Sequence, residues 1–390
     1  MVGDIRRQSY TRLRRTLAYG DLVARTIDLH ADYFDRGGWG NHARAFGNAL
    51  VNAAADTDFT GTTRQTSTEV KLIPTNPQGS LVWTHPALCS TAGGSKSIAL
   101  GSVSMISAFN CKNCIFCTVW ETSEVPANFV KALRHADQIW VPTTWGKEIF
   151  LRAGLSESRI AVVPEGVDTV RFSPPVEARQ RNRLRFVCVG KWEERKGQTL
   201  LLDAFCNAFS ATDDVELIMH CHNPYLPGFS ADKTIRNYVN NRYPNPPRIL
   251  TTDYLNENDY VNLLQSSDVF VLPTRAEGWG LPILEAMACG VPAIVTNYSA
   301  HLVFANRNNS WLIDVDCMCK VTDNRFFDQS LQWGHWAQPS HDHLVSLLLE
   351  SCHNRTERKR KATNARATAL AWTWHSAAIQ AHRCLIDSNG

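Results

Sequence analysis

The 390-residue sequence has no long hydrophobic run and carries little net charge. No stretch approaches the ~18 consecutive apolar residues that a membrane-spanning helix needs. The net charge is only +3, which is too small to indicate a polyanion partner, so we expect no specific nucleic-acid binding. Hydrophobic residues make up 44% of the chain and charged residues 20%, which is typical of a globular protein with room for two domains.

The N-terminus lacks the apolar segment of a secretory signal, although arginines stand at positions 6, 7, 12, 14 and 15. We therefore expect a cytoplasmic protein. The basic start either makes weak contact with an anionic membrane surface or is a solvated lead-in to the first domain.

The twelve cysteines do not indicate a small disulfide scaffold in a chain of this length. Cys111, Cys114 and Cys117 are spaced so that three thiols could lie close together. A zinc or iron–sulfur site there would need a fourth ligand, such as Cys89 or His85. The other interpretation is that 114–120 is simply an apolar strand. We adopt the second and predict no metal requirement.

The segment from 269 to 296 organises the chain. Val269–Leu272 is a short apolar run that favours a strand buried on both faces. Gly278 and Gly280 then allow a tight turn beside a ligand. A helix is expected from Pro282 to about Cys289, and Pro292–Thr296 begins the next strand. Such a βαβ unit binds its ligand at the carboxyl ends of the strands.

Two carboxylates, Glu277 and Glu285, mark this unit. As isolated residues they would cap the helix and lie on the surface, respectively. The run Glu-Gly-Trp-Gly-Leu-Pro-Ile-Leu-Glu, followed by Ala-Met-Ala-Cys-Gly-Val-Pro, resembles the donor-site signature of glycosyltransferase family 4. Members of that family are retaining enzymes with two Rossmann-like domains, the GT-B fold. The resemblance implies that Glu277 holds sugar hydroxyls and Glu285 the ribose. It also implies donor contacts for Gly278, Trp279, Gly280 and Leu281.

A basic loop follows the expected strand Leu184–Val189 and reads Gly190-Lys-Trp-Glu-Glu-Arg-Lys-Gly. Loop lysines are usually solvated. The spacing of Gly190, Lys191 and Lys196, however, resembles the family's diphosphate-binding loop. The resemblance implies a donor contact for Gly190 and two fixed cations that stabilise the departing nucleotide. The family more often has arginine at the first position, so Lys191 keeps the charge but loses bidentate geometry. We expect the neighbouring Arg195 to be exposed.

Further candidates lie in the first half of the chain. A glycine loop with Gly38 and Gly40 is either an ordinary turn or, as in the family, a segment that faces the donor diphosphate. His85 follows the expected strand 80–84, and it either bonds a loop or, as in many relatives, lies near the reacting sugar. Glu121 and Glu124 resemble part of an acceptor-domain pattern, and they contact an acceptor or cap the helix expected after Pro126.

The expected fold is α/β with GT-B architecture. Strands that alternate with helices predict a parallel sheet with helices on both faces. The family resemblance implies two such Rossmann-like domains, with their sheets facing across a cleft. The proline-rich run at 160–175 resembles the family's interdomain segment. We therefore predict an acceptor-side domain over 1–175, a donor-binding domain over 176–371, and a last helix in 372–390 that packs back on the first domain.

The predicted function is retaining transfer of a sugar from a UDP- or GDP-sugar to a hydroxyl of a glycan, lipid-linked or small-molecule acceptor. No cofactor beyond this co-substrate is expected. The resemblance implies catalytic roles for Lys191, Lys196, Glu277 and His85. Alternatives are a nucleotide-sugar epimerase, a phosphorylase on the same fold, or a decayed glycan-binding protein. No motif for a free phosphate site or a pyridoxal phosphate lysine is visible, which argues against a phosphorylase. The four charged donor residues, Lys191, Lys196, Glu277 and Glu285, are all present, which argues against decay.

Overall fold

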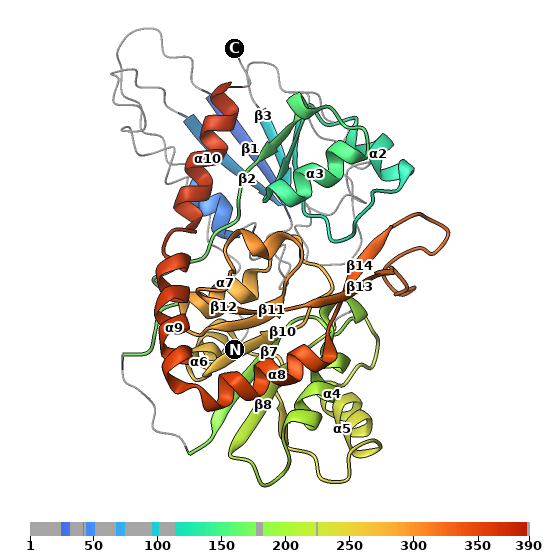
Figure 1. Ribbon diagram of the computed structural model, residues 1–390. Helices are drawn as coiled ribbons and strands as arrows, with labels where there is room; N and C mark the ends of the chain where they lie inside the picture. Colours follow the sequence, from blue (N-terminus) through green and yellow to red (C-terminus); the bar gives the residue numbers. More distant parts are fainter. Residues whose placement is uncertain are drawn as a thin grey trace.

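The computed structural model describes residues 25–31, 42, 44–50, 68–74, 96–100, 114–176, 182–223 and 225–387. Within them the chain forms two parallel β-sheets, one above the other in Figure 1, with helices packed around each. Chain segments at the carboxyl ends of the two sets of strands contact each other. This is the arrangement that the sequence predicted: an α/β protein with two Rossmann-like domains.

The first sheet has six described strands in the order β2-β1-β3-β4-β5-β6, and all their pairings are parallel. They are β1 (Arg25–Ala31), β2 (Thr68–Pro74), β3 (Lys96–Leu100), β4 (Cys114–Cys117), β5 (Gln138–Val141) and β6 (Ile160–Val162). Helices α2 (Ala127–Leu133) and α3 (Thr144–Arg152) cover one face of this sheet.

The second sheet has the order β12-β11-β10-β7-β8-β9, again with parallel pairings. In chain order this is 3-2-1-4-5-6, the Rossmann arrangement. Its strands are β7 (Leu184–Val189), β8 (Val215–His220), β9 (Arg248–Thr251), β10 (Val269–Leu272), β11 (Ala293–Thr296) and β12 (Ser310–Ile313). The helices between them are α4 (Gln198–Ala208), α5 (Ala231–Asn240), α6 (Glu257–Gln265) and α7 (Leu281–Ala288).

Strands β7 and β10 begin and end where the sequence predicted. All residues of β10 are buried, because helices cover both faces of the sheet at its centre. Side chains at the helix starts explain where several helices begin, since each accepts a hydrogen bond from a backbone N–H of the first turn. These caps are Thr143 before α3, Ser230 before α5 and Asn256 before α6.

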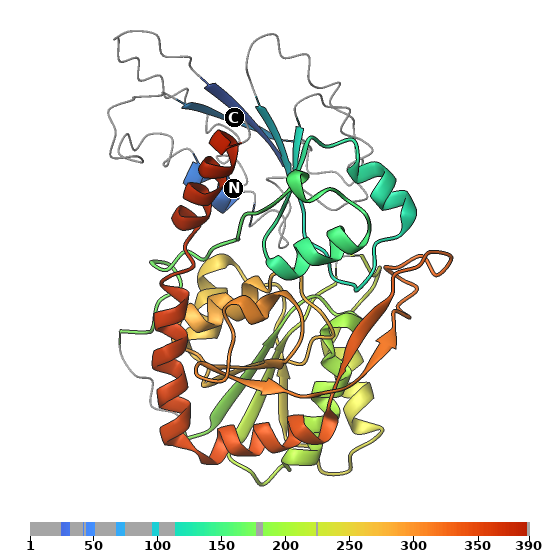
Figure 2. The ribbon, with the colours of Figure 1, turned by 45° about the horizontal axis from the view of Figure 1, so that its top comes forward.

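An antiparallel pair, β13 (Val315–Lys320) and β14 (His335–Pro339), follows the second sheet. Figures 1 and 2 show it reaching from the second domain toward α2 of the first. The sequence did not predict this hairpin. Helices α8 (His341–His353) and α9 (Arg355–Ala369) then return along the second domain. No helix in the described ranges is long and apolar enough to span a bilayer.

The last helix, α10 (Trp374–Asp387), lies against the first domain beside the strands of its sheet (Figure 2). Its Ala377, Ala378 and Ala381 belong to the same buried cluster as Phe46 and Ile98 of the first domain. The chain therefore crosses between the domains a second time, next to the first crossing. The two crossings pair at Val167 and Thr373. The predicted packing of the last helix on the first domain is confirmed.

Gly197 should be the glycine that the second domain tolerates least well when changed. Its φ is +69°, and a Cβ there would lie 2.2 Å from the carbonyl oxygen of Pro273. Gly228 has φ +73° with open space around it, so Gly228→Ala measures the cost of the left-handed backbone alone, about 1–2 kcal/mol. We expect Gly197→Ala to lower the free energy of urea unfolding by clearly more than this control does. Equal losses would contradict the steric constraint.

Candidate active site

Three loops meet where strands of the two sheets end: 190–197 after β7, 273–280 after β10 and 118–124 after β4. The first two are joined by their backbones, since the N–H of Arg275 donates to the carbonyl of Arg195 at 2.7 Å. The third approaches at Gly278, where a Cβ would come within 2.4 Å of the Val119 side chain. The segments that hold the predicted donor-site and acceptor-side residues are therefore in contact.

Lys196 and Glu277 form the central ion pair. The Lys196 Nζ lies 2.8 and 2.9 Å from the two carboxylate oxygens of Glu277, and both residues are buried. Burial alone would raise the pKa of Glu277, but Lys196 and Arg195 lower it to about 2. The Ser299 hydroxyl also accepts a hydrogen bond from the Glu277 N–H at 2.8 Å. The carboxylate is thus held ionised and fixed in position.

Arg195 is not the exposed residue that the sequence predicted. Only 5% of it is accessible, and its guanidinium contacts three carboxylates and one carbonyl. The carboxylates belong to Glu193 at 2.5 Å, Glu121 at 3.0 Å and Glu277 at 3.3 Å. Burial opposes the charge of Arg195, but these carboxylates more than compensate and hold its pKa above the usual range. The prediction failed because the three partners are far apart in the sequence or belong to the loop itself.

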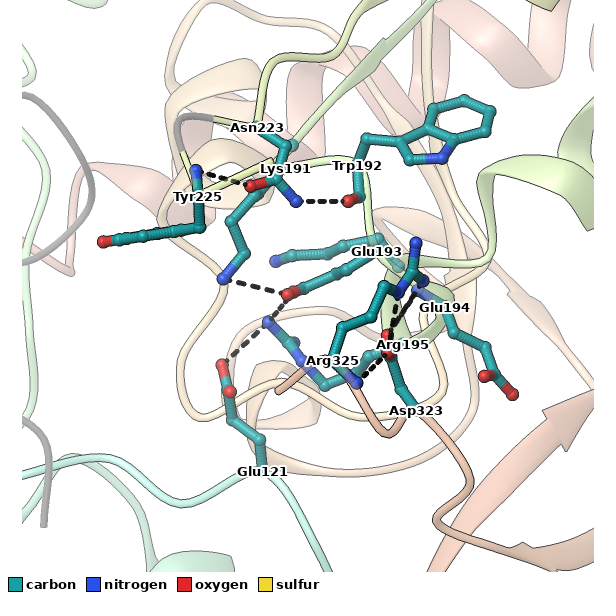
Figure 3. Close-up of polar contacts among 12 residues, drawn as sticks. Glu121, Lys191, Trp192, Glu193, Glu194, Arg195, Asn223, Tyr225, Asp323 and Arg325 are labelled. Carbon is teal, nitrogen blue, oxygen red and sulfur yellow. Dashed lines mark hydrogen bonds and ion pairs between the residues drawn. The ribbon is translucent and has the colours of Figure 1, made fainter. Parts of the chain in front are cut away.

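Lys191 lies at the other end of the same network (Figure 3). Its Nζ is 2.9 Å from Glu193 and lies over the rings of Phe326 at 4.5 Å and Tyr225 at 5.2 Å. About a third of the Lys191 side chain is exposed, so its ammonium is held and still accessible to a ligand. Burial acts to raise the pKa of Glu193, but Arg195 and Lys191 lower it below the usual range.

The cluster is balanced in charge. Three cations, Lys191, Arg195 and Lys196, face three carboxylates, and each lysine has one carboxylate as its partner. The carboxylates are Glu121, Glu193 and Glu277. An anionic ligand at this position would share the two ammonium groups with Glu193 and Glu277, since each ammonium has three N–H donors. The arrangement can therefore bind and release negative charge without leaving a buried cation unpaired.

Glu285 is buried on α7 and accepts a hydrogen bond from the Tyr260 hydroxyl of α6 at 2.6 Å. Burial raises its pKa to about 7, and the nearby Glu165 adds to the effect, although the Tyr260 hydrogen bond opposes it. The interpretation of Glu285 as a solvated surface residue is wrong. Tyr260 was not predicted, and no signal in the sequence connects it to Glu285.

The predicted donor residues in and after the glycine turn before α7 have different surroundings. Gly280 precedes α7 with φ +101°, and the half-buried Leu281 begins the helix. The side chain of Trp279 is in the core, edge-on to Phe304 and Trp372. A donor contact by Trp279 would therefore have to come from its backbone.

The two acceptor-side candidates, Glu121 and Glu124, have different surroundings. Glu121 is ion-paired with Arg195, as above, whereas Glu124 has an exposed side chain. Helix α2 starts after Pro126, as predicted, but no side chain caps it, so the interpretation of these glutamates as helix caps is wrong. Gly38, Gly40 and His85 lie outside the described residues.

The cysteine cluster is not assembled in the way that its spacing indicated. Cys114 and Cys117 are both buried on β4, but positions three apart on a strand point to opposite faces. Cys114 packs with α2 and α3, and Cys117 packs with α10. Cys111 lies outside the described residues. Among those that are described, no group of three or more His, Cys, Asp or Glu side chains could hold a metal ion.

Sequence reasoning also missed two histidines. His42 lies 3.2 Å from Glu165, where the chain crosses between the domains, and both are buried. His42 follows the glycine loop and Glu165 lies in the interdomain run, so both stand in segments that the sequence singled out. His301 is fully buried, with Nε2 2.8 Å from the carbonyl oxygen of Thr296. Its short helical turn follows Ser299, which binds the Glu277 backbone.

Comparison with known proteins finds similar sequences and similar structures. Residues 183–322 match the family model described as "Glycosyl transferases group 1". Mannosylfructose-phosphate synthase of Agrobacterium fabrum is 27% identical over 217 residues, which are 48% of this chain and 47% of that protein. A GDP-mannose-dependent phosphatidylinositol monomannoside mannosyltransferase of Corynebacterium glutamicum is 30% identical over 149 residues, 34% and 37% of the two chains. The chain thus spans less than half the length of these relatives.

Two solved structures are similar over nearly the whole chain. Sucrose-phosphate synthase from Thermosynechococcus elongatus has a TM-score of 0.65 at 16% identity and covers 93% of this chain and 98% of its own. Anabaena HepE in complex with UDP and glucose has a TM-score of 0.63 at 13% identity, with 93% and 99% covered. The chain therefore has the GT-B fold. Within this fold, residues 183–322 are similar to the glycosyltransferases that the family model describes.

The raised pKa of Glu285 predicts a pH-dependent stability. Between pH 4.5 and about 7 the folded protein keeps a proton that the unfolded chain releases, so the free energy of unfolding falls as pH rises through this window. The full effect is about 3 kcal/mol, at about 1.36 kcal/mol per pKa unit. Glu285→Gln stays neutral and should flatten the curve, giving a variant more stable than wild type at pH 8.

Urea unfolding between pH 5 and pH 8 measures this effect. Glu148→Gln is the control, because Glu148 is a mostly exposed glutamate of the first domain. It should leave the slope of wild type unchanged. The same slope for wild type and Glu285→Gln would show that Glu285 does not titrate in this range.

Proposed function

We propose that the protein is a retaining glycosyltransferase that moves a sugar from a UDP- or GDP-sugar to an acceptor hydroxyl. The observation that carries the proposal is the Lys196–Glu277 pair beside Lys191, at the carboxyl ends of β7 and β10 and next to the start of α7. Ligands of doubly wound sheets bind at such an edge. Backbone N–H groups at the start of a helix and fixed ammonium groups together suit a diphosphate.

The similar proteins support this choice of donor. One relative is named as GDP-mannose-dependent, another as a UDP-Gal-using galactosyltransferase, and one similar structure contains UDP and glucose. The acceptor class proposed here, a hydroxyl on a glycan, a lipid-linked sugar or a small molecule, is as broad as these names. We keep glycosyltransferase family 4 as the proposed family.

Each charged residue has a proposed role. Lys191 and Lys196 stabilise the negative charge that grows on the nucleotide as its bond to the sugar breaks. Glu277 holds sugar hydroxyls, and Lys196 fixes its orientation. Glu285, next to Tyr260, binds the ribose. The acceptor hydroxyl attacks from the face that the nucleotide leaves, which gives net retention. Gly38, Gly40 and His85 are proposed to complete the site from the first domain.

Incubation with a mixture of UDP- and GDP-sugars and a panel of hydroxyl acceptors tests the proposal. A transferase yields free nucleotide and a glycosylated product, an epimerase yields a changed nucleotide sugar, and a binding protein yields neither. A thermal-shift panel of the same nucleotide sugars identifies the donor first, because a ligand that binds only the folded state raises its stability. Epimer formation, or binding without turnover, would overturn the proposal.

Turnover should not depend on a divalent cation, because Lys191 and Lys196 are proposed to neutralise the diphosphate. We expect the initial rate with the best donor to stay the same in excess EDTA. The matched reaction contains EDTA with Mg²⁺ or Mn²⁺ added in excess. Complete loss of activity in EDTA that either metal restores would refute this assignment.

Substitutions at the donor site should differ in their kinetic signatures. Lys196→Ala removes a charge whose value grows in the transition state, so it should lower kcat more than it raises donor KM. One such fixed contact is typically worth about 10²–10³-fold. Glu285→Gln weakens an interaction with the unreacting ribose and should act mainly on donor KM. Glu277→Gln should change both.

Steady-state kinetics with varied donor distinguishes these cases. Lys233→Ala removes an exposed lysine of the same domain and serves as the control. Because Lys196, Glu277 and Glu285 are all buried, unfolding curves must accompany the kinetics. Near-normal turnover by all three folded variants would mean that the donor binds elsewhere.

A further inference from the structure

We propose that Glu121 of the first domain is a positioning residue for the donor site, and that it acts on Glu277 through Arg195. The inference rests on the proposed glycosyltransferase function and adds a role that neither the family resemblance nor the comparisons assign. It also replaces direct acceptor binding, the interpretation that remained for Glu121 after helix capping was ruled out.

The first observation is the position of Arg195 between the two domains. Its Nη2 lies 3.0 Å from Glu121 Oε1 and 2.5 Å from Glu193 Oε1, and its Nη1 lies 3.3 Å from Glu277 Oε1. One rigid, planar group thus joins a carboxylate of the first domain to the proposed sugar-binding carboxylate of the second. Figure 3 shows Glu121 pointing from the loop of the first domain toward Arg195.

The second observation is that the backbone of this loop is docked onto the β13–β14 hairpin. The Trp336 indole N–H donates to the carbonyl oxygen of Glu121 at 2.8 Å. Ser123 and His335 exchange two hydrogen bonds, at 2.8 and 3.2 Å. Glu121 is therefore held beside Arg195 by elements of the second domain and does not reach it as a free side chain.

The third observation is that Arg195 and Lys196 share one oxygen of Glu277. Oε1 is 2.8 Å from Lys196 Nζ and 3.3 Å from Arg195 Nη1. The carboxylates of Glu121 and Glu193 attract the other terminal nitrogen of the guanidinium, Nη2, and so pull Arg195 away from Glu277. Without the charge of Glu121, Arg195 would interact more strongly with Glu277 and compete with Lys196 for it. Glu121 thus keeps Glu277 oriented by Lys196.

This role links the two domains during the reaction. The donor residues have their described arrangement only while the 118–124 loop is docked on the second domain. A residue that orients a reacting group changes kcat for every reaction of the donor, with or without an acceptor. A residue that binds the acceptor changes acceptor KM and leaves hydrolysis of the donor by water unaffected.

The test compares Glu121→Gln with wild type in two assays, sugar transfer and acceptor-free hydrolysis of the same nucleotide sugar. We expect both kcat values to fall by the same factor, roughly three- to thirtyfold, as for directly coupled residues. Acceptor KM should not change. Glu148→Gln, which removes an exposed glutamate near Arg152 in the first domain, is the control and should leave both assays unchanged.

Arg195→Lys and the double variant identify the route of the effect. Lysine keeps the charge but lacks the planar guanidinium that holds Glu121 and Glu277 at two separate nitrogens, so Arg195→Lys should also lower both rates. Adding Glu121→Gln to it should have little further effect, because the connection is already broken. Unfolding curves confirm that the proteins compared are folded. Should Arg195→Lys fail to fold, the equal fall of the two rates in Glu121→Gln decides the question alone.

Two results would overturn the inference while the proposed function stands. One is a Glu121→Gln variant with raised acceptor KM or with unchanged hydrolysis. The other is multiplicative effects in the double variant. A wild-type protein that turns over no nucleotide sugar would instead overturn the proposed function, and the role of Glu121 with it.

Discussion

The close approach of Gly197 to Pro273 sets the geometry on which the candidate site depends. With no Cβ at residue 197, the loop after β7 can lie directly against the loop after β10, and the backbones of Arg195 and Arg275 then bond to each other. These are backbone contacts, so they fix the relative position of the two loops whichever side chains they carry. Lys196 and Glu277 are brought together as a consequence, although 81 positions separate them.

The charged cluster shows why this geometry has to be accurate. Lys196, Arg195 and Glu277 are each less than a tenth exposed, and removing such groups from water is costly unless opposite charges and hydrogen bonds replace the solvent. Three cations and three carboxylates meet this condition within one network. The same balance makes the network responsive, because each lysine ammonium has three N–H donors and can bind a diphosphate while it stays paired with Glu193 or Glu277. Stability and ligand response thus depend on the same side chains.

Much of the fold could be predicted from local sequence patterns, whereas the site could be predicted only in part. Strands β7 and β10 are mostly apolar runs with clear boundaries, since helices bury the centre of the sheet on both faces. Lys191, Lys196, Glu277 and Glu285 stood out because their spacing resembles a family signature. The burial of Arg195 and the Tyr260 contact of Glu285 depend on residues distant in the sequence, which no local pattern records. The β13–β14 hairpin was missed because residues 315–339 gave no clear periodic signal.

The position of α10 affects how the chain can be made and divided. Ala377, Ala378 and Ala381 complete a core whose other members, such as Phe46, Ile98 and Trp140, come from the first half of the sequence. During synthesis the first domain leaves the ribosome early but cannot close this core until the last helix has emerged. The second domain has all its sheet strands and intervening helices by then and can fold first. A fragment that stops at the first crossing would leave these side chains uncovered.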